Sequence, residues 1–90
     1  MARRKVYIVK SGSLHPTTKT YWLTPTYYTS KKVALLEKDQ ILDINRAKEI
    51  SEWDEMIKHD PHLISMTDYV GEDGKYKARV VVEWAWLNSY

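Results

Sequence analysis

The sequence predicts an α+β fold, in which an antiparallel sheet of about four strands carries a helical segment packed on one face. The strongest observation is the alternation over 75–87, where every second residue from Tyr76 to Trp86 is apolar and the residues between them are mostly polar, which is typical of a long strand. The turn Gly71-Glu72-Asp73-Gly74 directly before it indicates a hairpin. A third observation, an apolar stripe at helical spacing in the middle of the chain, predicts the helical segment.

Two further strands are expected in the amino-terminal third. Residues 4–10 are expected to form a strand with Val6 and Ile8 on one face and Tyr7 and Val9 on the other, and we expect Val6 and Ile8 to point into the core. Residues 20–29 are rich in Thr, Tyr and Trp, which suit a pleated, half-buried surface. Because Pro25 cannot donate a backbone hydrogen bond, this stretch should form an edge strand, or two short pieces bent at the proline.

The helical segment is expected at about 30–59. Ser30 is a candidate N-cap, and Pro61 ends the pattern. The sequence leaves open whether the segment is one helix or two helices broken near 40–43. Strands at 63–70 and 75–87 then flank the glycine turn. The predicted core consists of Val6, Ile8, Leu36, Ile50, Trp53, Ile57, Val80, Val82 and Trp84.

Composition fits one folded domain, 1–90, with 43% hydrophobic and 29% charged residues. The net charge of +2 conceals a segregation of charge along the chain. Residues 1–32 hold seven Lys and Arg and no acid, whereas residues 33–74 hold eleven of the twelve acids. Such segregation indicates either a surface for a partner or nucleic acid, or an acidic helix lying beside basic strands.

Several function classes are disfavoured. The chain has no Cys, which removes disulfides and thiolate metal sites. No apolar run approaches the length of a membrane span, and the basic amino terminus lacks the apolar stretch of a secretory signal, so we expect a cytoplasmic protein without membrane contact. His59, Asp60 and His62, with His15, are the only clustered metal-ligand types, and His59 is better explained by the end of a helix. With no catalytic motif in the chain, we expect no enzyme activity, cofactor or metal.

The aromatic content favours binding. There is no Phe, but there are four Trp and seven Tyr, residues that combine an apolar body with a polar group and are common at interface hot spots. We therefore expect a protein-binding module that occludes or modulates a partner protein. Seven residues of the acid-free stretch are the predicted contact residues: Arg3, Arg4, Lys5, Tyr21, Trp22, Tyr27 and Tyr28.

In size, charge segregation and polar aromatics, the chain resembles the small accessory proteins of phages and mobile elements that block host enzymes or defence complexes. That resemblance is one of general character and implies an inhibitor-like role. The alternative is a nucleic-acid-binding protein that uses the basic aromatic stretch 3–32, because cations interleaved with aromatic platforms hold single strands. A homodimer is also predicted, since the carboxy-terminal strand has apolar residues on both faces near Val81, Ala85 and Leu87.

Overall fold

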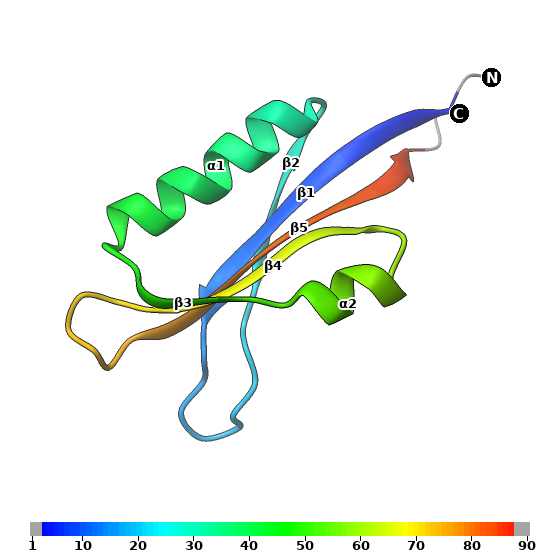
Figure 1. The fold of residues 1–90 in the computed structure, drawn as a ribbon. Coiled ribbons are helices and arrows are strands. Elements are labelled where there is room, and N and C mark those ends of the chain that lie inside the picture. Colours follow the sequence, from blue (N-terminus) through cyan, green and yellow to red (C-terminus); the bar gives the residue numbers. More distant parts are fainter. Residues whose placement is uncertain (1–2, 88–90) are drawn as a thin grey trace.

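The computed structural model describes residues 3–87 and shows a five-stranded antiparallel sheet with two helices, which confirms the α+β prediction (Figure 1). The strands are β1 (Arg4–Ser13), β2 (Thr24–Tyr28), β3 (Lys48–Glu52), β4 (Leu63–Val70) and β5 (Lys77–Leu87). The helices are α1 (Lys31–Ile44) and α2 (Asp54–His59). The strand order is β2-β1-β5-β4-β3, so the predicted carboxy-terminal strand lies at the centre of the sheet.

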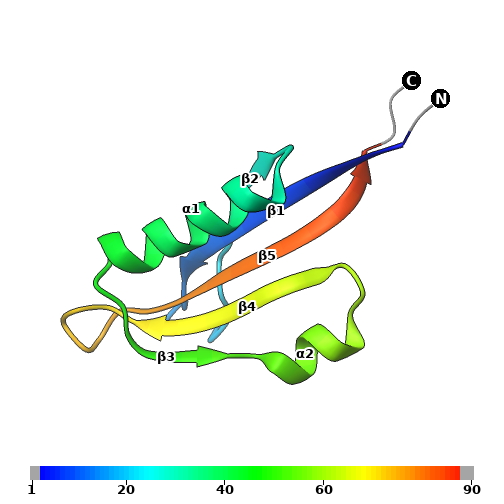
Figure 2. The same ribbon diagram turned by 45° about the horizontal axis from the view of Figure 1, so that its top comes forward.

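The core lies between the sheet and α1. Helix α1 packs against β1, β2 and β5, and its Ala34 is completely buried (Figure 2). Below it, Val82 of β5 lies directly opposite Val9 of β1 in the strand register, and both are fully buried. The alternation of β5 therefore points its Val80 and Val82 into the core, as predicted. The buried cluster comprises Val9, Ala34, Tyr69, Ala78, Val80 and Val82.

The prediction for the inward face of β1 was wrong. Because residues opposite each other in an antiparallel pair share a face, Val9 lies on the core side with Val82. The period of two along a strand then places Val6 and Ile8 on the opposite face, where both are half-buried. Residues 6–9 are all apolar or aromatic, so both faces of β1 look apolar in the sequence. The alternation alone therefore did not identify which face points into the core.

The prediction of helix through residue 59 was also wrong in part. Helix α1 ends at Ile44, and residues 48–52 form the edge strand β3 instead of a helix. The predicted apolar stripe consisted of Ala47, Ile50, Trp53 and Ile57, and these residues do not lie along one helix. Three members of the predicted core lie outside the observed core for this reason: Ile50 and Trp53 are exposed, and Ile57 is half-buried. A fourth, Leu36, does lie in α1, but it is 51% exposed.

Local contacts explain both ends of α1. At its start, the Ser30 hydroxyl accepts a hydrogen bond from the Val33 backbone N–H, as the N-cap prediction requires. At its end, Arg46 N–H donates to Asp43 C=O and Ala47 N–H donates to Leu42 C=O. This is the Schellman pattern, which needs a left-handed residue, and Arg46 supplies it with φ 49°.

The hairpin and edge-strand predictions are confirmed. Gly74 adopts φ 75° in the turn between β4 and β5, and the Asp73 carboxylate accepts hydrogen bonds from the backbone N–H groups of Lys75 and Tyr76. These bonds favour the charged carboxylate and lower the pKa of Asp73. Pro25 lies in β2, which is an edge strand. Neither helix within residues 3–87 has the length and apolar character needed to cross a membrane.

Candidate functional site

The central strands extend beyond their neighbours at one end of the sheet. Pairing of β1 with β2 stops at Tyr7, and pairing of β4 with β5 reaches only Glu83. Beyond those points β1 and β5 continue to pair with each other, as far as Arg4 opposite Leu87, and one backbone hydrogen bond joins Trp84 to His62 on the β4 side. We call this projecting two-stranded ribbon, residues 3–6 and 84–87, the β-arm; Figure 2 shows it extending past α1 and β4.

One side of the β-arm carries a cluster of indoles and cations. Trp84 and Trp86 meet edge to face with ring centroids 5.2 Å apart. The ammonium of Lys5 lies 4.5 Å from the centroid of Trp84 and 5.7 Å from that of Trp86. The Arg3 guanidinium lies 5.3 Å from the Trp86 centroid. Since Trp86 is 41% exposed, this cluster presents aromatic surface and positive charge together.

The chain before β4 holds this cluster in place. The indole N–H of Trp84 donates to the Pro61 carbonyl at 3.1 Å, and the backbone N–H of Trp84 donates to the His62 carbonyl. The His62 ring lies 4.3 Å from the Trp84 ring, and its Nδ1 is 2.9 Å from the Trp84 carbonyl oxygen. Trp84 is therefore held in place by these bonds, and the more exposed Trp86 and the Lys5 ammonium lie against it.

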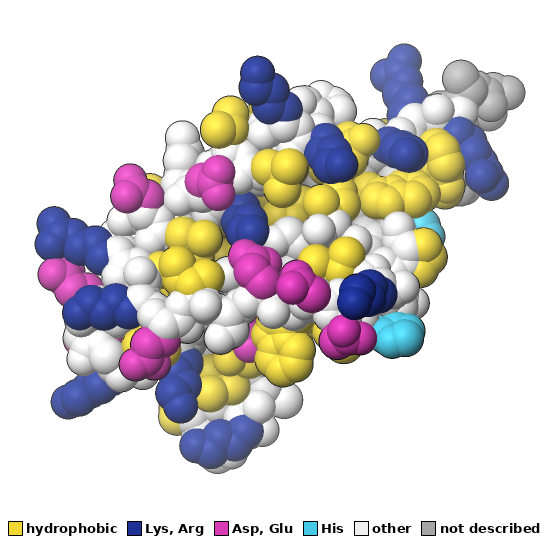
Figure 3. Space-filling model, in the orientation of Figure 1, with side chains coloured by type: hydrophobic (Ala, Val, Ile, Leu, Met, Phe, Trp, Pro, Cys, Tyr) yellow, Lys and Arg dark blue, Asp and Glu magenta, His cyan; other side chains and the backbone are white. Residues whose placement is uncertain are grey.

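The surroundings of the β-arm are basic. Thr29 lines a hollow together with Arg4 and Lys5 of the β-arm. Lys31 and Lys32 follow Thr29 closely in the chain, at the start of α1, and so lie near the β-arm. That hollow measures about 380 Å³ and is lined by Arg4, Lys5, Val6, Tyr7, Thr29 and Leu87. Figure 3 shows the strip of hydrophobic side chains at this end flanked by Lys and Arg side chains, with no acid among them.

The structure brings some of the predicted contact residues together and separates others. Arg3 and Lys5 lie on the indole side of the β-arm, and Arg4 lies on its other side. Tyr21 and Trp22 follow the far end of β1, roughly 27 Å from Lys5 at the usual rise per strand residue.

The two tyrosines of β2 face opposite sides of the sheet. Tyr28 is half-buried and packs against the core, opposite Tyr7. Tyr27 is 62% exposed and lies on the opposite face. The aromatic residues of 3–32 therefore do not form one continuous surface.

Sequence reasoning missed Trp86, the main exposed element of the site, and placed Trp84 in the core. Both indoles continue the inward face of β5, so the alternation grouped them with Val82. A signal was present in the lengths, since β5 has eleven residues and β4 has eight. A hairpin built from unequal strands leaves the end of the longer one without a neighbour.

The far end of the sheet has a polar network on the face opposite α1. The Asp68 carboxylate accepts two hydrogen bonds from Arg79, at 2.6 and 3.1 Å, and one from the Trp53 indole at 2.8 Å. The Arg79 guanidinium in turn lies 4.1 Å from the ring centroid of Tyr21. Burial, and to a smaller extent the Asp68 charge, raises the pKa of Tyr21. Because these groups satisfy one another, the network fixes the sheet rather than offering open donors.

Trp22, by contrast, remains accessible at that end. It is 63% exposed and stacks on the His15 ring at 4.4 Å between ring centroids. His15 itself is occupied in its loop, where its Nδ1 accepts hydrogen bonds from the backbone N–H groups of Thr17 and Thr18. Trp22 thus lies on an ordered loop far from the β-arm.

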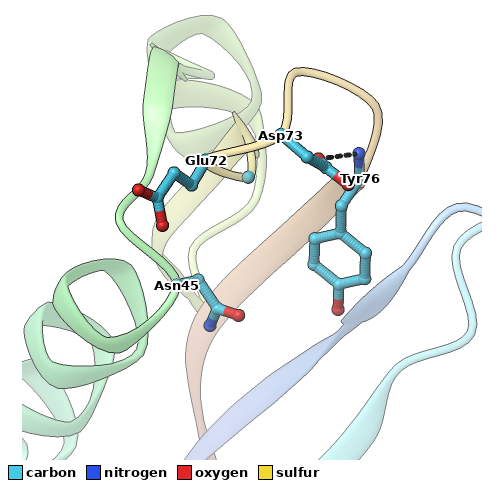
Figure 4. A pocket seen from close by; sticks show the side chains of 5 residues that line it. Asn45, Glu72, Asp73 and Tyr76 are labelled. Atoms are coloured by element: carbon cyan, nitrogen blue, oxygen red, sulfur yellow. Dashed lines mark hydrogen bonds between the residues drawn. The ribbon is translucent and has the colours of Figure 1, made fainter.

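A second hollow, of about 470 Å³, lies at the turn between β4 and β5 (Figure 4). Two of its polar side chains are already engaged in hydrogen bonds. Asp73 accepts the backbone N–H groups of the turn, and the Asn45 side chain donates to the Ile41 carbonyl at 2.7 Å. The hollow therefore lies between the end of α1 and the β4–β5 turn, and these side chains serve the local structure there. Within residues 3–87, no group of three His, Asp or Glu side chains is arranged to hold a metal ion.

Comparisons with protein-family models, with curated proteins and with solved structures found no match to this chain.

Proposed function

We propose that this chain is a cytoplasmic, non-enzymatic protein-binding module that occludes or modulates a partner protein, with the β-arm as its contact surface. The observation that carries the proposal is the exposed Trp86 with the cations of Lys5 and Arg3 held over it. Trp and Arg are the residues most enriched at interface hot spots. An inhibitor-like role of the kind found in phage accessory proteins fits a projecting arm that can enter a concave surface.

The charge of the β-arm specifies the kind of partner. Arg3, Arg4 and Lys5 lie within it, and Lys31 and Lys32 lie at the nearby start of α1. A partner with an acidic surface would be steered toward this end, and charge complementarity of this kind acts mainly on the association rate. The indoles would then supply contact area that slows dissociation.

The test compares the wild type with Trp86→Ala, using Trp22→Ala as the matched control at the other end of the sheet. Each protein is used to capture partners from a lysate of the cells in which it occurs, and the captured partner is then titrated by biolayer interferometry. Loss of a hot-spot indole should weaken binding about 30-fold, chiefly through faster dissociation. Trp22→Ala should bind like the wild type. Equal affinity of Trp86→Ala and wild type for the partner would reject the β-arm as the contact surface.

Nucleic-acid binding is the second candidate, because the β-arm is a basic two-stranded ribbon. Such a ribbon fits the major groove of duplex DNA, and exposed indoles stack on the bases of single strands. Fluorescence anisotropy with single- and double-stranded oligonucleotides at about 50 mM salt distinguishes the two candidates. We expect nothing tighter than the non-specific range of ~10⁻⁶ M. A nanomolar affinity that falls steeply with salt would promote this second candidate.

Self-association remains a prediction. The middle of β5 is closed by β1 and β4, so a dimer through this strand must use residues 84–87, beyond the end of β4. Sedimentation equilibrium at high micromolar concentration should then give twice the 10.7 kDa mass of the chain. A species of monomer mass would remove the homodimer.

A further inference from the structure

The β-arm has an open strand edge on the side of β1 that faces β2. The last residue of β1 paired with β2 is Tyr7, opposite Tyr28. After Tyr28 the chain turns away, and Ser30 caps α1 instead of extending β2. Residues 4–6 of β1 therefore have β5 on one side and no strand on the other among the residues that the structure describes. This leaves a slot about 10 Å long at the usual rise per strand residue.

The hydrogen-bond directions along β1 show which backbone groups face the slot. At the far end of the strand, the Ser13 carbonyl accepts from Trp22 on the β2 side, and the Leu14 N–H donates to Lys77 on the β5 side. Pairing with β5 is continuous along β1, without a register shift. Strand residues point their backbone groups alternately to the two sides, so the odd-numbered residues of β1 face β2. The N–H and C=O of Lys5 consequently point into the slot.

The slot is open. Within residues 3–87, neither Thr29 nor Ser30 forms a backbone hydrogen bond with Lys5. The hollow of about 380 Å³ lies along the same edge and combines the cations of Arg4 and Lys5 with the apolar surfaces of Val6 and Leu87. A segment that pairs with Lys5 would thus place an apolar side chain near this hollow and its charged side chains near the cations.

From these observations, and resting on the proposed function, we propose that the partner supplies an extended acidic segment that adds as a strand to the edge of β1 at residues 4–6. Strand addition of this kind gains affinity from backbone hydrogen bonds and specificity from alternate side chains. The free Lys5 groups supply the backbone bonds. The surrounding cations select acidic residues, and the hollow selects apolar ones between them.

The test uses the full chain and a fluorescein-labelled peptide, Glu-Val-Glu-Val-Glu-Val, in fluorescence-anisotropy titrations. The key variant is Lys5→Pro, which removes the donor on the open edge but no hydrogen bond to β5. Its matched control is Lys5→Ala, which removes the same charge and keeps the N–H. Lys5→Pro should bind the peptide about fivefold more weakly than Lys5→Ala, the factor expected for one hydrogen bond.

Two further measurements keep the proposal testable if Lys5→Pro unfolds. The same peptide with alternate backbone amides N-methylated, in either register, should bind wild-type protein at least about fivefold more weakly in the register that pairs with Lys5. Hydrogen exchange of the Lys5 amide should slow when the unmodified peptide is bound. A Lys-Val peptide of the same length should not bind.

Several outcomes would overturn strand addition. They are equal binding by Lys5→Pro and Lys5→Ala, indifference to N-methylation in both registers, and no peptide binding at millimolar concentration. Tighter binding of a single-stranded oligonucleotide than of the peptide would assign the β-arm to nucleic acid. If Trp86→Ala loses the captured protein partner while Lys5→Pro and Lys5→Ala retain it equally, the proposed function stands and strand addition does not.

Discussion

At the residue scale, the burial of Tyr69 makes the stability of the fold depend on pH. Its side chain is only 4% exposed, in the core between α1 and the sheet. Burial, and then the nearby Tyr76, raises the pKa of Tyr69 above 10.0, because the charged phenolate is disfavoured in apolar surroundings. Folding is therefore easiest while this phenol keeps its proton.

The free energy of unfolding should fall as the pH rises above 10, because the unfolded chain releases the Tyr69 proton there while the folded chain retains it. Tyr69→Phe should flatten this decline, leaving the part due to Tyr21 and Tyr28, whose pKa values are also raised. Urea unfolding between pH 8 and about 11 measures it. An unchanged slope in Tyr69→Phe would contradict the assignment.

At the element scale, the end of α1 is decided by one residue in an unusual conformation. Arg46 takes the left-handed position of the Schellman motif, where glycine is usual. The motif brings Ala47 and Leu42 together, and both pack against the core. Tertiary packing thus holds a helix end that the local sequence does not mark with Gly or Pro.

Arg46→Gly should therefore stabilise the protein by about 1 kcal/mol, because glycine adopts positive φ without strain. That gain corresponds to a rise in Tm of about 4–8 °C for a domain of this size. The ion pair of Arg46 with Glu72 is exposed and worth little. Arg46→Ala is the control, since it removes the ion pair and keeps the strain; it should change Tm by much less. Destabilisation by Arg46→Gly relative to Arg46→Ala would argue against strain at this position.

At the scale of the whole molecule, the protein has a narrow core on one side of a long sheet. The sheet extends past its helix at the β-arm, and the principal extents of the molecule are 48 × 25 × 23 Å. Stability therefore depends on the few residues under α1, while the β-arm, our proposed contact surface, lies where the core ends. Trp86→Ala in the β-arm should therefore weaken binding with little loss of folding free energy.

The same layout predicts unequal costs for two apolar truncations. Val82→Ala removes methyl groups from a fully buried site and should cost about 2 kcal/mol, counting the cavity left behind. Leu36→Ala removes more atoms, but Leu36 is 51% exposed on α1, where alanine also favours the helix, so its cost should be under about 1 kcal/mol. Urea midpoints of the two variants test the order. The reverse order would place the core on the other side of α1.

The sequence by itself determined the fold class, the hairpin at Gly74, the N-cap at Ser30 and the edge position of Pro25, because local backbone chemistry fixes each of these features. It also determined that Val80 and Val82 face the core, since a period of two survives in any sheet. Only the tertiary structure decided that 48–52 pairs as a strand. The helix ends before this segment because Arg46 adopts a strained left-handed conformation, which the packing of Leu42 and Ala47 against the core stabilises. Likewise, the sequence identified the cations of the β-arm, but only strand register showed that Trp86 lies beyond the end of β4, where its indole is exposed.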